Sequence, residues 1–136
     1  MNTKDKGAIA ESAVLHELLK QGLCVSIPYG DNAPYDLVVD TPSGLKKVQV
    51  KTAHLSQGVI KATTTFRTGS DRRGYEIYKD LVDFIAIYCI ENGKCYAIPS
   101  NECKSCLNLR EEIPLNNQTT GIRYACDFEL FKVIHK

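Results

Sequence analysis

The sequence lacks a strong excess of charge of either sign, and it lacks long apolar runs. Lysine and arginine number 17, aspartate and glutamate number 16, and the formal net charge is +1. A polyanionic partner would therefore have to be held by local clusters of charge, because the overall potential is close to neutral. No run approaches a membrane span, and the start at Lys4 to Lys6 lacks the apolar block of a signal peptide. We expect a soluble cytoplasmic protein that does not act on a membrane.

Internal repeats and low-complexity segments are also missing from the sequence. With 136 residues, 43% of them hydrophobic, the chain can bury a sizeable core without covalent staples. We therefore expect one domain over residues 1–136.

Six cysteines are present, and in a chain of this kind they favour reduced thiols over a disulfide framework. Cys103 and Cys106 have the two-residue spacing of half a zinc site, which Cys89 and Cys95 could complete. A second closely spaced pair is missing, so the pattern favours buried or incidental thiols.

Two alternating segments, residues 35–39 and 47–51, flank a Pro-Ser-Gly turn and predict a β-hairpin. If the turn centres between Pro42 and Ser43, residues whose numbers sum to 85 lie opposite each other. This register places Asp36 across from Gln49, and Lys51 shares their polar face because strands alternate with period two. The other face turns toward the core and carries Tyr35, Leu37, Val39, Val48 and Val50.

A helix is predicted from about residue 6 to residue 21, where Gly22 ends it. Its apolar residues are Ala8, Ala10, Ala13, Leu15, Leu18 and Leu19. Glu11 lies among them, and a carboxylate on a core-facing stripe is costly unless it is paired or binds a metal. The alternative is that Glu11 reaches solvent at the edge of the stripe. The neighbouring hairpin favours the functional interpretation.

The rest of the chain predicts an α/β domain with a central mixed sheet. Strands are expected at residues 23–28 and 59–66, a loop at 67–74, and a short helix at 75–79. A second hairpin joins residues 84–90 to 94–98 through an Asn-Gly turn, with Asp83 ending the turn before it. Ser100 is expected to cap a short helix toward Leu107. The apolar tail, residues 122–134, is consistent with either a strand or a helix.

The polar face of the first hairpin suits phosphodiester hydrolysis, which needs a hard cation and a positioned water. Mg²⁺ prefers oxygen ligands, so the Asp36 carboxylate, the Gln49 amide oxygen and the Val50 carbonyl form a partial set of ligands. Lys51 would then face the attacking water or the phosphate. It either orients or deprotonates the water or stabilises charge, and the residues alone fit both roles.

Taken together, Glu11, Tyr35-Asp36 and Gln49-Val50-Lys51 resemble the motif of the PD-(D/E)xK nuclease superfamily. Tyr35 stands where the motif has proline, and Gln49 stands where most members have Glu or Asp. Glutamine at this place is similar to the bacterial group I intron-encoded homing endonucleases, whose relatives include the archaeal Holliday junction resolvases. The stretch over residues 78–88 also looks like that branch.

The resemblance implies a restriction-endonuclease-like α/β core, a central mixed β-sheet flanked by helices. It further implies a Mg²⁺-dependent, sequence-specific double-strand DNA endonuclease that leaves 5′-phosphate and 3′-hydroxyl ends. The implied catalytic residues are Glu11, Asp36, Gln49 and Lys51, and the implied metal ligands are Asp36, Gln49, the Val50 carbonyl and Glu11. Cutting both strands needs two sites, so at least a homodimer is implied, and the homing branch suggests a tetramer. The apolar tail, if exposed, would supply such contacts.

Double-stranded DNA is expected to be held by basic side chains that flank the hairpin in sequence. These are Lys46, Lys47, Lys61, Arg67, Arg72 and Arg73. Two alternative functions stay open. The first is a resolvase of Holliday junctions or other branched DNA, and the second is a catalytically inactive DNA-binding module, marked by Gln49.

Overall fold

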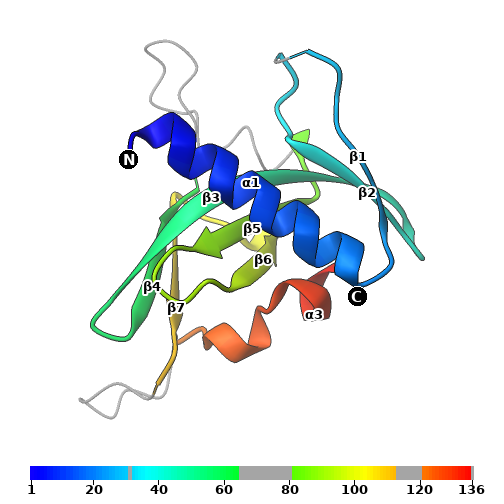
Figure 1. Cartoon of the computed structure of the whole chain (residues 1–136). Coiled ribbons are helices and arrows are strands. Elements are labelled where there is room, and N and C mark those ends of the chain that lie inside the picture. Colours follow the sequence, from blue (N-terminus) through cyan, green and yellow to red (C-terminus); the bar gives the residue numbers. More distant parts are fainter. Residues whose placement is uncertain (31, 65–80, 113–120, 136) are drawn as a thin grey trace.

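The computed structural model of the protein describes residues 1–30, 32–64, 81–112 and 121–135 (Figure 1). Its elements are α1 (Thr3–Lys20), β1 (Cys24–Ser26), β2 (Leu37–Thr41), β3 (Gly44–Ser56), β4 (Val59–Thr63), β5 (Phe84–Cys89), β6 (Cys95–Pro99), β7 (Cys106–Arg110) and α3 (Leu130–Ile134). Short 3₁₀ helices cover Ser100–Glu102 and Ala125–Asp127. The predicted loop over residues 67–74 and the helix over 75–79 lie outside the described residues. No helix within the described ranges is long and apolar enough to cross a membrane.

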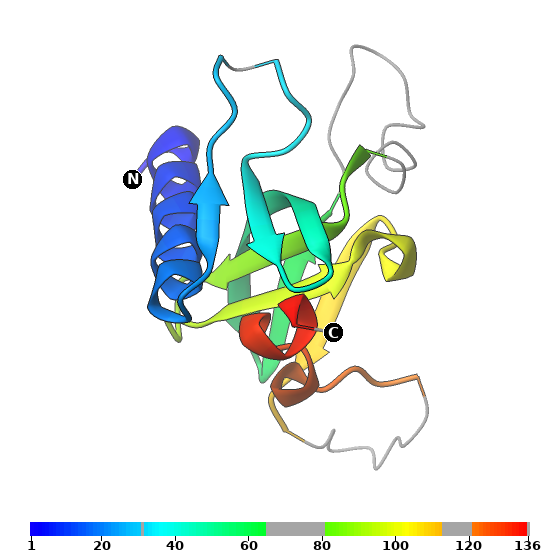
Figure 2. The ribbon, with the colours of Figure 1, turned by 90° about the vertical axis from the view of Figure 1, so that its right-hand side faces the viewer.

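Strand β3 is the centre of a mixed sheet with the order β1-β2-β3-β4-β7. It pairs antiparallel with β2 and β4 and parallel with β5, which in turn pairs antiparallel with β6. Helix α1 crosses one face of this sheet, and the view turned by 90° shows it along one side of the molecule (Figures 1 and 2). The predicted α/β core with a central mixed sheet is confirmed.

The sheet separates two hydrophobic cores. The helix-side core consists of Ala10, Val14, Leu18, Leu37, Val39, Val48, Val50, Phe84, Ala86, Cys95, Ala97, Leu130, Val133 and Ile134. The far-side core consists of Ala53, Ile60, Ala62, Val82, Ile85, Ile87, Cys89, Tyr96, Ile98, Leu107, Leu109 and Ala125. Strand β5 supplies alternate residues to both cores, which explains its unbroken apolar sequence.

Helix α1 has a defined start and a defined end. The Asn2 side chain accepts a hydrogen bond from the N–H of Asp5, and Gly22 adopts a φ of 78° just after the last turn. The buried face of the helix carries Ala10, Val14 and Leu18. Two residues of the expected apolar set are not buried, because Ala8 is exposed and Leu19 is 53% exposed. Spacing by three to four residues selects a narrower set than apolar character alone.

The first hairpin has the predicted register, with Leu37 opposite Val48 and Thr41 opposite Gly44. Leu37 and Val48 are both fully buried in the helix-side core. Tyr35 was assigned to the wrong face, because it packs against the far-side core instead. Period-two alternation applies within a paired strand, and Tyr35 precedes the start of β2.

The second hairpin, β5–β6, is confirmed, with Ile85 opposite Ile98. The predicted helix from Ser100 toward Leu107 was wrong. Ser100 starts one short 3₁₀ turn, its hydroxyl donates to the Val82 carbonyl, and residues 106–110 form β7 against β4. Burial of Leu107 and Leu109 on alternate positions of β7 selects a strand.

The tail ends in the short helix α3, which packs beside β6. Leu130, Val133 and Ile134 are buried in the helix-side core, so these apolar residues do not form the exposed contact surface that was expected. Phe131 is 45% exposed.

Candidate active site

The candidate site lies where strands β2 and β3 part. Asp36 precedes the first residue of β2, and its N–H still donates to the Val48 carbonyl at 2.9 Å. Its carboxylate oxygen Oδ2 accepts the N–H of Val50 at 2.9 Å. The Asp36 side chain therefore accepts a backbone hydrogen bond that a neighbouring strand would otherwise accept. This bond holds Asp36 against β3, the strand that carries Gln49 and Lys51.

Glu11 and Asp36 are close enough to interact electrostatically. Burial, and then the charge of Asp36, raise the pKa of the Glu11 carboxyl above its ordinary value. Burial also raises the pKa of Asp36, while the Val50 N–H and the charge of Lys51 act in the opposite direction. Two partly buried carboxylates, one of which disfavours the ionised form of the other, are typical of a site that takes a cation.

Lys51 lies half-buried beside these carboxyl groups. Burial lowers the pKa of its amine, and the charge of Asp36 offsets part of this effect. The structure thus places Glu11, Asp36 and Lys51, from the helix and from two adjacent strand segments, in one electrostatically coupled group.

Gln49 lies next to this group with its amide turned toward the backbone. Its Nε2 donates to the Val50 carbonyl at 3.3 Å. The Gln49 amide and the Val50 carbonyl were both expected to offer an oxygen atom to a metal ion. In this arrangement, however, the amide nitrogen of Gln49 points toward the Val50 carbonyl. The amide must therefore turn about its last bond for Oε1 and the Val50 carbonyl to face one cation together.

The donor set fits a hard divalent cation. Its atoms are carboxylate, amide and carbonyl oxygens, which Mg²⁺ prefers. Burial raises the pKa of both Glu11 and Asp36, so their ionised forms would gain from a nearby cation. The described residues contain no group of three or more His, Cys, Asp and Glu side chains that could hold a metal. The expected ligands other than the two acids are the Gln49 amide oxygen and the Val50 carbonyl.

The predicted DNA contacts are distributed unevenly. Lys47 alternates with Gln49 and Lys51 on one face of β3, whereas Lys46 lies on the other face opposite Val39. Lys61 is exposed on β4 opposite His54, also off the face of Lys51. Arg67, Arg72 and Arg73 lie outside the described residues.

Two features near the site were missed from the sequence. Lys47 Nζ lies 5.4 Å from the centre of the Tyr35 ring, and the Asp83 carboxylate accepts the N–H of Lys47 at 2.8 Å. The sequence contained no signal for either contact, since Lys47 and Asp83 are separated by 35 intervening residues. Asp83 lies directly before β5, and its N–H donates to the Lys47 carbonyl of β3 at 2.9 Å.

Comparison with known proteins defines the class of this fold and site. The profile of the PD-(D/E)XK endonuclease family matches residues 1–131, so the chain belongs to this family. It is a DNA endonuclease, and nucleases of this family generally use divalent metal ions. Among solved structures, the chain is similar to a bacterial homing endonuclease, I-Ssp6803I, with a TM-score of 0.72 and 29% sequence identity over 95% of this chain and 89% of that one. No curated protein sequence matches it.

Proposed function

We propose that this chain is a Mg²⁺-dependent, sequence-specific double-strand DNA endonuclease of the homing type, formed by one domain over residues 1–136. The main support is the convergence of Glu11, Asp36 and Lys51 at the point where β2 and β3 part. The similarity to a bacterial homing endonuclease favours the homing type over other activities of the family.

Glu11, Asp36, Gln49 and the Val50 carbonyl would hold the ion. When bound, Mg²⁺ supplies stabilisation of the negative charge that accumulates on the phosphate. Before the ion arrives, the Val50 N–H keeps the Asp36 carboxylate in place, so the site needs little rearrangement apart from the Gln49 amide.

Lys51 would act on the attacking water. Its lowered pKa increases the fraction of neutral amine near neutral pH, which is the form able to accept a proton. Its charged form would instead stabilise the phosphate, and the pH-dependence of the reaction separates the two roles.

The proposed substrate is duplex DNA, and cutting both strands requires two copies of the site. A homodimer is therefore the smallest competent assembly, and a tetramer is the state suggested by the homing branch. The proposed phosphate or base contacts are Lys46, Lys47, Lys61, Arg67, Arg72 and Arg73.

The test is cleavage of a plasmid library with Mg²⁺ by the wild type, by Asp36→Ala and by Asp40→Ala. Asp40 is an exposed acid within β2, the strand that Asp36 precedes, and serves as the matched control. We expect cutting by the wild type and Asp40→Ala, and a loss of at least about 10³-fold in Asp36→Ala with DNA binding retained. Equal cutting by wild type and Asp36→Ala would refute the site. Wild-type binding without cutting would indicate an inactive module, and preference for four-way junctions over linear duplex would indicate a resolvase.

A further inference from the structure

One face of β3 carries a row of polar side chains that ends at the candidate site. Lys47, Gln49 and Lys51 alternate with Val48 and Val50, and the two valines are buried in the helix-side core. Residues two apart on a strand are about 6.6 Å apart, so Lys47 lies about 13 Å from Lys51 along this row. Of the basic residues expected to hold DNA, Lys47 is the only one within the described ranges that shares this face.

The backbone of Lys47 is fixed by Asp83. The Asp83 carboxylate accepts the Lys47 N–H at 2.8 Å, and the Asp83 N–H donates to the Lys47 carbonyl at 2.9 Å. Asp83 is held in turn by Ser100, whose N–H donates to the Asp83 carbonyl at 3.0 Å. The start of β5 therefore fixes the position from which the Lys47 side chain extends.

The side chain of Lys47 is directed by Tyr35. Its ammonium lies 5.4 Å from the centre of the Tyr35 ring, within the range of a cation–π contact. Tyr35 is anchored against the far-side core and directly precedes Asp36 in the chain. Among the described residues, no carboxylate forms an ion pair with Lys47. The Lys47 ammonium is thus held on the Tyr35 ring and forms no ion pair with a described acid.

A recess of about 450 Å³ opens beside Lys47. Polar residues at its wall include Lys46, Ser100 and Asn101. The recess leaves room for a strand of DNA backbone to continue past Lys47, on the far side of this residue from Lys51.

We propose that Lys47 binds a backbone phosphate of the strand being cut, and that Tyr35 is a positioning residue that holds the ammonium there. The separation of about 13 Å, compared with one phosphate per about 3.4 Å of helix axis on each strand, places this phosphate within about four nucleotides of the scissile one. The inference rests on the proposed function, because it assumes that the scissile phosphate lies at Asp36 and Lys51.

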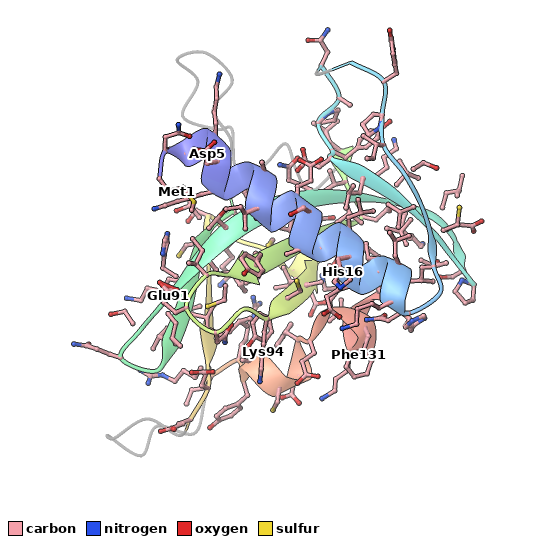
Figure 3. All side chains as sticks on the ribbon, in the orientation of Figure 1. Met1, Asp5, His16, Glu91, Lys94 and Phe131 are labelled. Carbon is pink, nitrogen blue, oxygen red and sulfur yellow. The ribbon has the colours of Figure 1, made fainter. Side chains whose placement is uncertain are left out.

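The experiment uses an intact DNA duplex that contains a sequence cut by the protein. Single phosphates of this duplex are replaced by neutral methylphosphonates, and binding is measured without divalent ions. For the wild type, we expect binding to weaken when the methylphosphonate replaces a phosphate within about four nucleotides of the cut. For Lys47→Ala, that position should no longer matter, and the slope of log affinity against log salt should fall by about 0.9. Lys47→Arg, which keeps the charge, should retain the sensitive phosphate. The control Lys94→Ala should match the wild type, because Figure 3 shows Lys94 near Phe131 of α3, away from β2.

Tyr35 is tested by removing either its hydroxyl or its ring. Tyr35→Phe keeps the aromatic face and should bind like the wild type. Tyr35→Leu should weaken binding several-fold in the wild-type background and should have no further effect in Lys47→Ala, with KM affected more than kcat.

An unchanged set of sensitive phosphates and an unchanged salt slope in Lys47→Ala would overturn the inference. The inference would also be overturned if Tyr35→Leu weakened DNA binding equally in the wild-type and Lys47→Ala backgrounds. The methylphosphonate scan measures binding and the plasmid assay measures cutting. A wild type that cuts at Asp36, combined with an unaltered scan in Lys47→Ala, therefore refutes this inference and leaves the proposed function intact.

Discussion

The N–H of Val50 donates to the Asp36 carboxylate at 2.9 Å, so an acid at the end of one strand is bound to the backbone of the next. In a continuous antiparallel ladder this N–H would meet a carbonyl of β2. Because the strands part at Asp36, the Val50 N–H donates to the Asp36 side chain instead. The same bond keeps a partly buried negative charge close to Glu11, whose pKa it helps to raise.

Asp36→Asn should stabilise the metal-free protein by about 1 kcal/mol. Asparagine can still accept the Val50 N–H, while it removes a carboxylate whose ionised form is disfavoured by burial. Differential scanning fluorimetry should therefore show a higher melting temperature than for the wild type. Added Mg²⁺ should raise the melting temperature of the wild type but not of Asp36→Asn. Asp40→Asn is the control, and an equal Mg²⁺ shift in Asp36→Asn would contradict the assignment.

The stability of the metal-free wild type should fall as pH rises above the ordinary carboxyl values of 3.8 for Asp36 and 4.5 for Glu11. Because the folded-state pKa values are raised, the native state binds more protons than the unfolded state between the ordinary and the folded pKa. The stabilisation that these protons provide is lost as pH rises through the folded pKa. Mg²⁺ competes with these protons, so its affinity should increase over the same window. Melting curves from pH 4 to pH 7 check both trends, and Glu11→Gln combined with Asp36→Asn should flatten them.

Lys51→Arg should reduce kcat by about 10²-fold with a smaller change in KM. Burial lowers the pKa of the Lys51 amine, whereas a guanidinium stays protonated and cannot accept a proton from water. Single-turnover rates from pH 6 to pH 9 measure the effect, and the wild-type rate should rise to its plateau at a lower pH than an ordinary lysine would allow. A kcat within a few-fold of the wild type would assign Lys51 a purely electrostatic role.

Gln49→Glu should increase the melting shift that Mg²⁺ produces and should destabilise the metal-free protein. A third carboxylate adds repulsion to Glu11 and Asp36, and it loses the hydrogen bond from Nε2 to the Val50 carbonyl. With Mg²⁺ bound, the same charge strengthens the ligand set, and the half-saturating Mg²⁺ concentration should fall several-fold. Unchanged Mg²⁺ dependence would show that Gln49 does not contact the ion.

Leu18→Ala should cost about 2–5 kcal/mol of unfolding free energy, whereas Leu19→Ala should cost less than about 0.5 kcal/mol. The two neighbours on α1 differ in burial, since Leu18 is fully buried and Leu19 is 53% exposed. Urea denaturation of both variants gives the comparison with the same chemical change. Similar costs would indicate that α1 does not pack on the sheet through Leu18.

Much of the fold was predictable because it depends on local periodicity. The hairpin register followed from alternation around the Pro42 to Gly44 turn, and the β5–β6 hairpin followed from its Asn-Gly turn. The region around Ser100 was wrong because a capping residue is a local signal, whereas the alternating burial of Leu107 and Leu109 depends on β4.

By itself, the sequence determined the register of β2 against β3, with Leu37 opposite Val48, and the face that Gln49 shares with Lys51, because period-two alternation sorts side chains without reference to the rest of the chain. Tertiary structure decided the remainder. It brought Glu11 from the helix to Asp36, turned Tyr35 to the far-side core, and bound Lys47 to Asp83. These contacts depend on which surfaces α1 and β5 cover, and residues far apart in a chain meet only after the sheet has formed.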